Sequence, residues 1–277
     1  MYFNATFVNR NSQLFNFTSH MLRLSICLLS FPYLSFSQEK IVHPNAHAHN
    51  DYKHVRPLKD ALLNGFISVE ADVHLQNKLL LVAHNRPGPT TETLEKLYLA
   101  PLDSLLKTSG GRIYPGYDKA FYLMIDCKTE ASSTYEAIRN AVTKYPRLRC
   151  SEGNCPVIIF LSGNRPLTQI VNGSYSGIGV DGRPADLGKG YSSDRMPVIS
   201  DHYVNWSRWD GKFKPLAEDL QRIKDLAQRT HDEGKKLRLW AIPDNELTWE
   251  ALLNAGVDFI NTDHLEALNL FLTRKGL

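Results

Sequence analysis

The chain has 277 residues, of which 43% are apolar, 10% aromatic and 22% charged, so it can bury a large core and is neither a disordered tail nor a coiled coil. Lysine and arginine number 32 against 29 aspartates and glutamates, a net charge of +3, which is too balanced for a surface that binds nucleic acid mainly through charge. The four cysteines exclude a disulfide-built scaffold in a chain of this length. We therefore expect one domain, or two small ones, and no nucleic-acid partner.

The N-terminal segment has the pattern of a targeting sequence. Met21 precedes a short basic region and a mostly apolar run over 24–36, and small residues follow up to Ser37. This pattern predicts a secretory signal peptide that starts at Met21 and is cleaved near Ser37, with an uncleaved amphipathic leader as the alternative. We expect leader and signal over 1–37, a single domain over 38–277, and a secreted or periplasmic product.

Two of the cysteines lie close together in the chain. Cys150 and Cys155 flank Ser-Glu-Gly-Asn, a turn-forming tetrapeptide, and in an exported protein a disulfide between them would persist. We expect that bridge, with two free thiols as the alternative. Cys127 lies inside an apolar strand and is expected to belong to the core.

Short apolar strands alternate with helical patterns from Ile41 onward, which is typical of parallel β-α units with the helices outside the sheet. The predicted strands are 41–47, 66–73, 121–127, 157–161, 176–180 within a glycine-rich stretch, 197–200, 237–242 and 259–261. The predicted helices are 56–63, 132–144, 216–233, 248–254 and 264–273. A small hairpin is predicted over 75–83, after the second strand. Eight such units predict an α/β fold, a (β/α)8 TIM barrel.

Polar residues gather at the carboxyl ends of these strands, where the active site of a TIM barrel lies. They are His47, His49 and Asn50 after strand one, Glu70 and Asp72 on strand two, His84 after the hairpin, Asp126 and Lys128 at strand three, Arg165 after strand four, and Trp240 on strand seven. The sequence therefore predicts a polar site at the barrel mouth.

Three carboxylates in this set suggest a metal site. Glu70 and Asp72 are two residues apart on a strand, so both side chains point to one face, and Asp126 ends the next parallel strand. Oxygen-only ligands favour one hard divalent cation, Mg²⁺ or Ca²⁺, over zinc. The alternative is a salt-bridge network at the mouth with Lys128 or Arg165.

The three histidines suit proton transfer, because an imidazole can carry a proton near neutral pH without a large environmental shift. His47, His49 and His84 are candidates for a general acid and a general base on either side of a phosphorus centre. For each histidine alone, a structural hydrogen bond is the alternative.

Two further residues suit a substrate pocket. Lys128 shares the face of Asp126, where its ammonium can hold a phosphate oxygen; pairing with Asp126 is the alternative. Trp240 can form an apolar wall for a substrate, with a place in the barrel core as the alternative.

These residues also carry a resemblance to a known family. His-Ala-His-Asn-Asp-Tyr from His47, Val-Glu-Ala-Asp-Val-His from Val69 and Leu-Val-Ala-His ending at His84 resemble the secreted, phospholipase-C-like branch of the glycerophosphodiester phosphodiesterase and phosphatidylinositol-specific phospholipase C-like superfamily. Leu-Met-Ile-Asp-Cys-Lys-Thr, residues 123–129, is similar to the third-strand motif of spider-venom sphingomyelinase D. The similarity runs over 47–272.

The resemblance implies a barrel phosphodiesterase of lipid metabolism in which two histidines act as base and acid. By position it assigns the metal to Glu70, Asp72 and Asp126, the second histidine to His84, and the substrate pocket to Lys128 and Trp240. For the first histidine we prefer His49, with His47 as the second candidate. His49 would remove a proton from water or from a substrate hydroxyl, the second route giving a cyclic phosphate, and His84 would protonate the leaving alcohol.

The sequence departs from the standard family pattern, because it lacks the His-Arg-Gly of strand one and the Pro-Glu-Asn-Thr that follows. The missing arginine removes a phosphate contact, and Asn50 or Arg165 is expected to take its place. The expected partner is a small phosphodiester or phospholipid-derived substrate, bound by a monomer, with peripheral membrane contact left open.

Two other functions remain as alternatives. An amidohydrolase-like metal hydrolase would use His47 and His49 on strand one and Asp263 after strand eight as its metal ligands. A secreted barrel that has lost activity and serves as a binding module is the other.

Overall fold

The computed structural model describes residues 41–150, 155–175 and 177–277, all of which belong to a compact unit over Glu39–Leu277. The predicted signal peptide and its cleavage site lie outside the described residues. Among the residues described, no helix is both long enough and apolar enough to cross a membrane.

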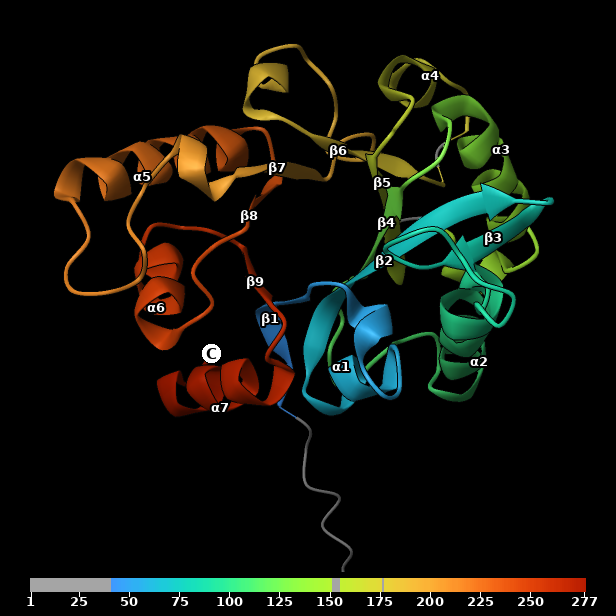
Figure 1. Cartoon of the computed structure of the whole chain (residues 1–277), viewed down its shortest axis with the longest axis horizontal. Coiled ribbons are helices and arrows are strands. Elements are labelled where there is room, and N and C mark those ends of the chain that lie inside the picture. Colours follow the sequence, from blue (N-terminus) through green and yellow to red (C-terminus); the bar gives the residue numbers. More distant parts are fainter. Residues whose placement is uncertain (1–40, 151–154, 176) are drawn as a thin grey trace, which may run out of the picture. The chain divides into compact units, whose positions relative to one another are not determined.

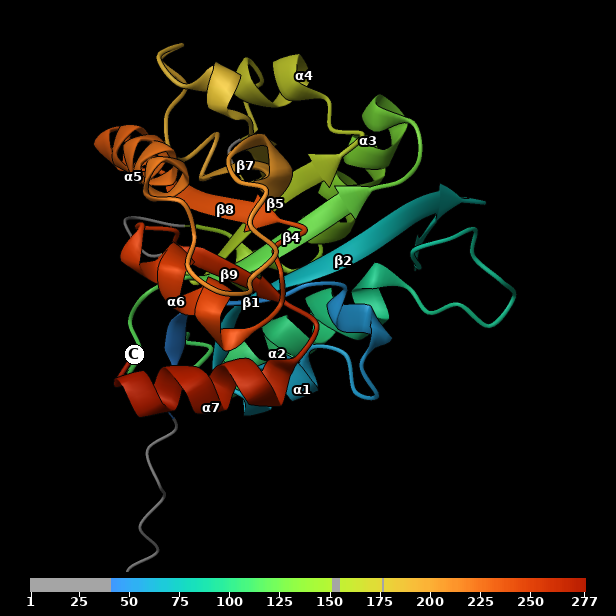
Figure 2. The same ribbon diagram turned by 60° about the vertical axis from the view of Figure 1, so that its left-hand side comes forward.

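Nine strands form a single sheet with the order β1-β9-β8-β7-β6-β5-β4-β2-β3. They are β1 His43–Ala48, β2 Phe66–Gln76, β3 Leu79–Val82, β4 Phe121–Cys127, β5 Val157–Gly163, β6 Gly179–Gly182, β7 Val198–His202, β8 Lys236–Trp240 and β9 Phe259–Thr262. Strand β1 pairs in parallel with both β2 and β9, which closes eight parallel strands into a barrel. Strand β3 runs antiparallel to β2 and forms the predicted hairpin, which extends beyond the barrel (Figure 2).

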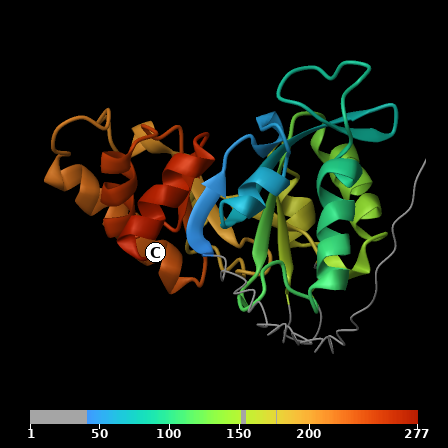
Figure 3. The same cartoon turned by 90° about the horizontal axis from the view of Figure 1, so that it is seen from below.

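The helices lie outside the ring of strands (Figure 1). They are α1 Lys59–Leu63, α2 Ala100–Thr108, α3 Ala131–Val142, α4 Leu167–Val171, α5 Ala217–Asp232, α6 Glu246–Asn254 and α7 Leu265–Lys275, with a π-helical segment Glu95–Leu99 before α2 and short 3-10 turns at Asp51–Lys53, Pro146–Leu148, Pro184–Asp186 and Tyr203–Asn205. Seen from below, the green α2 and α3 and the orange-to-red helices α5 to α7 lie on opposite sides of the strands (Figure 3). The predicted TIM barrel is confirmed.

The predicted elements needed correction in two places. Helices α2 and α4 were missed, and β6 begins at Gly179, so that 177 and 178 are not part of the strand, while residue 176 lies outside the described residues. The first turn of α3 is capped by Glu130, whose carboxylate accepts hydrogen bonds from the backbone N–H groups of Ser132 and Ser133 and so satisfies two of the helix's unpaired donors. After α5 the chain turns at Gly234, whose φ of +67° is the left-handed conformation common just beyond a helix C-terminus.

The inside of the barrel is packed below the mouth. The rings of Tyr122 on β4 and Phe259 on β9 meet edge to face with centroids 4.9 Å apart. Tyr122 shares a face with Asp126, four residues further along the same strand, which corresponds to about 13 Å at the rise of a β-strand. The aromatic pair therefore fills the barrel interior and leaves the polar residues at its carboxyl end.

Candidate active site

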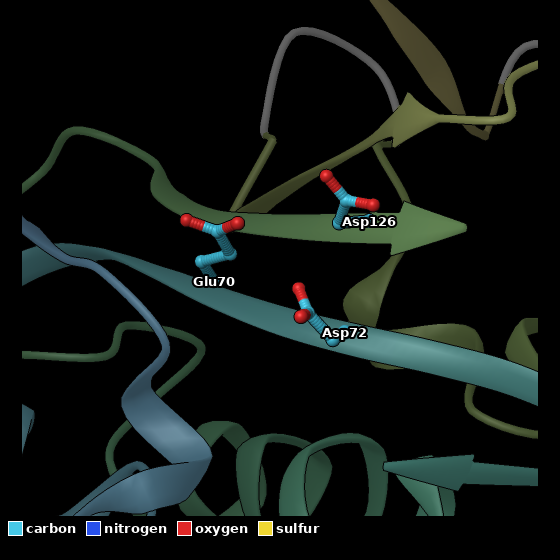
Figure 4. Close-up of side chains that lie close together, drawn as sticks. All are labelled: Glu70, Asp72 and Asp126. Atoms are coloured by element: carbon cyan, nitrogen blue, oxygen red, sulfur yellow. The ribbon is translucent and has the colours of Figure 1, made fainter. Parts of the chain in front are cut away.

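Three carboxylates converge at the mouth from two neighbouring strands. Glu70 and Asp72 lie on β2, and Asp126 on β4 is directly in register with Asp72. One oxygen of each carboxylate lies within 4.8 Å of an oxygen of the other two, and the three side chains project to the same side of the two strands (Figure 4). Glu70 and Asp72 are buried and Asp126 is half-buried. Such a cluster of like charges requires cations close by.

One of these cations is Lys128, whose Nζ lies 3.0 Å from Asp72 Oδ2 and 3.1 Å from Asp126 Oδ1. Burial would lower the pKa of Lys128, but the two carboxylates raise it, so the ammonium stays charged. Burial raises the pKa of Asp126, and the charge of Lys128 opposes that rise. The pairing considered as an alternative for Lys128 is thus present.

The carboxylate of Asp72 keeps one oxygen without a partner. Its Oδ1 is buried and accepts no hydrogen bond from the described residues, whereas Oδ2 accepts from Lys128 and from the Tyr52 hydroxyl at 2.8 Å. A buried carboxylate oxygen without a partner is costly. The donor set of three carboxylates with this orphaned oxygen fits a hard divalent cation.

The second cation of the site is Arg238, which the sequence analysis did not single out. It lies on β8, is nearly fully buried, and its Nη2 is 3.2 Å from Glu70 Oε2 while its Nε donates to Asn261 at 2.9 Å. Burial alone would raise the pKa of Glu70, but the adjacent His47 ring and the charge of Arg238 outweigh burial and lower it to about 2. Glu70 is therefore a carboxylate at all ordinary pH values.

The two histidines of strand β1 have different surroundings. His47 is fully buried, with Nδ1 2.7 Å from Ser68 Oγ and Nε2 3.6 Å from Glu70 Oε2. Burial, followed by the charge of Arg238, lowers the pKa of His47 to about 4, so its ring is neutral at neutral pH. His49 is one-third exposed, and its Nδ1 lies 2.8 Å from Asp263 Oδ1.

This division of partners disfavours the amidohydrolase arrangement. His47 faces Ser68 and Glu70, whereas His49 faces Asp263. Within the described ranges, these two histidines and Asp263 do not form a group of ligand atoms suited to one ion, as the carboxylates do.

The segment after β1 is fixed by two side chains. Asn50 has a left-handed backbone, φ +49°, and its amide lies 3.0 Å from His49 Nε2. Asp51 accepts from the backbone N–H of Leu58 at 2.5 Å and from the Tyr98 hydroxyl at 2.8 Å. Asp51 is thus a structural residue that holds the loop on which His49 and Asn50 lie.

His84 and Trp240 lie apart from this network in the structure. The His84 ring is exposed and 3.3 Å from Asn85 Oδ1, and it makes no ion pair with the carboxylates among the described residues. The preceding residue, Ala83, donates its N–H to the backbone oxygen of Asp72, which keeps this segment beside strand β2. The Trp240 ring is one-third exposed, and its centroid lies 4.0 Å from that of His202.

The remaining predicted residues lie further round the barrel or outside it. Arg165 follows β5, is half-buried, and its Nη1 donates to the backbone oxygen of Gly163 at 3.5 Å. The structure joins Cys150 and Cys155 by a disulfide, and Cys127 is buried as a free thiol.

Comparison with known proteins gives two matches to protein families. The AIM6-like phosphodiesterase domain matches residues 35–176, and the glycerophosphoryl diester phosphodiesterase family matches residues 236–266. The first match covers β1 to β5 with the three carboxylates, and the second covers β8 and β9 with Arg238.

Several curated relatives carry the name altered inheritance of mitochondria protein 6, or are called its homolog. The protein from Saccharomyces cerevisiae is 30% identical over 274 residues, which covers 79% of this chain and 68% of the relative. The homolog from Arthroderma benhamiae is 29% identical over 257 residues, covering 80% and 81%, and the protein from Eremothecium gossypii is 26% identical over 266 residues, covering 81% and 68%.

The closed barrel, the acidic mouth and these matches define a domain of the glycerophosphodiester phosphodiesterase and phospholipase C-like superfamily. Within that superfamily, the chain belongs to the AIM6-like phosphodiesterase domain family.

Proposed function

We propose that this chain is a metal-dependent phosphodiesterase that cleaves the phosphodiester bond of a glycerophosphodiester or of a phospholipid head group at the barrel mouth. The observation that carries the proposal is the cluster of Glu70, Asp72 and Asp126, with the buried Oδ1 of Asp72 left without a partner. The match of the chain to phosphodiesterase families supports the reaction class.

The three carboxylates would hold one divalent ion, Mg²⁺ or Ca²⁺, since all their ligand atoms are oxygens. When bound, such an ion offsets negative charge on a phosphate oxygen and polarises the phosphorus centre. Lys128 stands beside two of the carboxylates, where its ammonium can attract the phosphodiester anion to the same place.

His49 is proposed as the general base. Its ring is accessible, and Asp263, at 2.8 Å from Nδ1, holds the tautomer in which Nε2 is the acceptor and stabilises the imidazolium that forms when it takes a proton. In the structure Nε2 faces the Asn50 amide at 3.0 Å, and it can accept the proton once that amide turns to the phosphate. His47 suits this role less well, because it is fully buried and its lowered pKa makes its ring a weak base.

His84 is proposed as the general acid that protonates the leaving alcohol. Support comes from its backbone position beside Asp72 and from its exposed ring, which can turn toward a bound substrate. Trp240, at the carboxyl end of β8, is proposed as an apolar wall of the substrate pocket, and Asn50 as a donor to phosphate. The nucleophile is water or a substrate hydroxyl, and phosphorus NMR of the products separates the two routes, since only the second gives a cyclic phosphate.

The test is hydrolysis of bis(4-nitrophenyl) phosphate by the mature protein with Mg²⁺, with Ca²⁺ and after chelation. We expect activity that depends on one of these ions, and a loss of about 100-fold or more in Asp126→Asn. The matched control is Glu246→Gln, which removes an exposed carboxylate paired with Arg274 outside the mouth. Titration calorimetry should show ion binding by the wild type and by the control but not by Asp126→Asn. Equal rates and equal ion binding in all three proteins would contradict the proposal, and tightly held zinc would favour a different hydrolase.

A further inference from the structure

Two arginines follow neighbouring strands at the mouth, next to the carboxylate cluster. Strand β5 ends at Gly163 and β6 at Gly182, and the two strands pair in parallel with Leu161 opposite Val180. Arg165 and Arg183 therefore come within two residues of the carboxyl ends of adjacent strands. Both lie at the edge of the barrel where substrates bind in this fold.

Arg183 is anchored by a buried carboxylate. Its Nη1 donates to Asp181 Oδ2 at 2.9 Å and to the backbone oxygen of Gly182 at 2.7 Å. Asp181 is fully buried and also accepts from the hydroxyls of Ser162, at 2.8 Å, and Ser200, at 2.6 Å. Arg183 thus uses only Nη1 for the side-chain hydrogen bonds that the structure shows. Nε and Nη2 remain available as donors to a ligand.

Arg165 has no such anchor. Its Nε is buried without a hydrogen-bond partner, and the 3.5 Å contact of Nη1 to the backbone oxygen of Gly163 is the one side-chain hydrogen bond that the structure gives it. Among the described residues no carboxylate forms an ion pair with its guanidinium. Among the half-buried arginines that the structure describes, it alone has a side chain with neither an ion pair nor a hydrogen bond shorter than 3.5 Å. Burial lowers the pKa of Arg165, the charge of Arg183 lowers it further, and the more distant charges of Asp181, Asp186 and Asp126 partly oppose that fall. A half-buried cation without a partner is unfavourable until an anion joins it.

The position of β5 puts this pair beside the carboxylates. Ser162 is in register with Asp126 on β4, and a Cβ built on Gly163 would lie 2.2 Å from Asp126 Oδ1. The arginines follow strands on the far side of Asp126 from His49, which lies after β1 and pairs with Asp263 after β9. From this order of strands we infer that an anion held there would be a different group from the phosphodiester that the proposed function places between the carboxylates and the histidines.

We propose that Arg165 and Arg183 form a subsite for a second oxyanion of the substrate, a carboxylate or a phosphate monoester, in addition to the scissile phosphodiester. The proposal rests on the proposed function, and it narrows the substrate class to phosphodiesters whose head group carries its own negative charge. Two planar guanidinium groups suit such a group, because each can donate two parallel hydrogen bonds to it.

The first experiment measures phosphate binding in the absence of catalysis. Its result therefore does not depend on whether the chain is a phosphodiesterase. Inorganic phosphate is titrated by calorimetry in the presence of a chelator, into the wild type, Arg165→Met, Arg183→Met and the surface control Arg274→Met. We expect binding to weaken about 10-fold or more in the two mouth variants and to stay unchanged in the control. Equal affinity in all four proteins would overturn the subsite.

The second experiment compares two esters of equal chain length, 4-nitrophenyl butyl phosphate and 4-nitrophenyl 3-carboxypropyl phosphate. The wild type should prefer the acid-ended ester in kcat/KM, and the ratio of the two kcat/KM values should fall about 10-fold in Arg165→Met and Arg183→Met. A ratio that both variants leave unchanged would overturn the subsite. If the wild type hydrolyses neither ester, the proposed function fails and the phosphate titration alone decides.

A folding readout separates binding from a structural role. Because Arg165 has no close partner, Arg165→Met should keep or slightly raise the melting temperature, as expected for a residue retained for binding and not for stability. Arg183→Met, which leaves the buried Asp181 without its arginine, should lower it. A large loss of stability in Arg165→Met would show a structural role and overturn the assignment of that residue.

Discussion

Asp51 is predicted to make the stability of this protein depend on pH, in a way that one substitution removes. The carboxylate is fully buried, its Oδ2 accepts two hydrogen bonds from Leu58 and Tyr98, and its Oδ1 has no partner in the described part of the chain. Burial raises the pKa of Asp51 from 3.8 to about 6, although the hydrogen bonds oppose that rise. The folded protein therefore binds a proton on Asp51 more tightly than the unfolded chain does.

The sign and size of the effect follow from this difference. The contribution of Asp51 to the free energy of unfolding is highest below pH 3.8, where the group is protonated in both states, and falls as the pH rises to about 6 and above. The difference between 3.8 and about 6 corresponds to a total of about 3 kcal/mol. About 2 kcal/mol of this falls between pH 4.5 and 7.5.

Urea unfolding of wild type and Asp51→Asn across pH 4.5 to 7.5 measures this directly. The amide does not titrate, so the wild type should lose about 2 kcal/mol relative to Asp51→Asn as the pH rises. The control is Glu266→Gln, which removes an exposed carboxylate and should follow the wild type. Parallel curves for wild type and Asp51→Asn would refute the reasoning, because they would show that Asp51 has the same proton affinity folded and unfolded.

Two further substitutions test the geometry of the mouth. Gly163→Ala should lower the free energy of unfolding by about 1 kcal/mol or more, because the residue has a φ of +63°. It should also weaken ion binding, because the new Cβ would lie 2.2 Å from Asp126 Oδ1. Calorimetry measures both effects, and an ion affinity equal to that of the wild type would contradict the predicted clash. Asp263→Asn should lower kcat by about 100-fold or more without affecting ion binding, because the His49 ring would lose the carboxylate that holds its tautomer. An unchanged kcat would show that His49 is not the general base.

The barrel could be predicted from the sequence because each parallel strand is a short apolar run followed by polar residues and a helical pattern. The two missed helices, α2 and α4, lack a regular helical spacing of apolar residues that is long enough to be recognised. Helix α4, Leu167–Val171, has only five residues, too few for a helical period to be visible. Helix α2 has a proline at its second position and follows a π-helical segment at Glu95–Leu99, which breaks the regular spacing of apolar residues.

In the candidate site, too, the residues that could be predicted are those that follow a local sequence rule, and the missed ones depend on contacts between distant parts of the chain. Glu70 and Asp72 could be placed together because side chains two apart on a strand share a face, and Asp126 because neighbouring strands end at the same edge. Arg238 offered a weaker indication, a charge between two leucines on an apolar strand. Its partner Glu70 lies 168 residues away, and no spacing rule connects residues so distant. The contact of Tyr52 with Asp72 depends likewise on the left-handed turn at Asn50.

The charges at the mouth now suggest why both cations are needed there. Glu70, Asp72 and Asp126 contribute three negative charges, Lys128 and Arg238 two positive ones, and the buried ring beside Glu70 is neutral at pH 7. The net charge of these five side chains is thus −1, so a divalent ion bound among them would bring it to +1, and a phosphodiester anion would then bring it to zero. Without the two cations the same carboxylates and ion would stay at −1 and repel the substrate. The cations therefore make an acidic metal site compatible with an anionic substrate, which is the property that the proposed reaction requires.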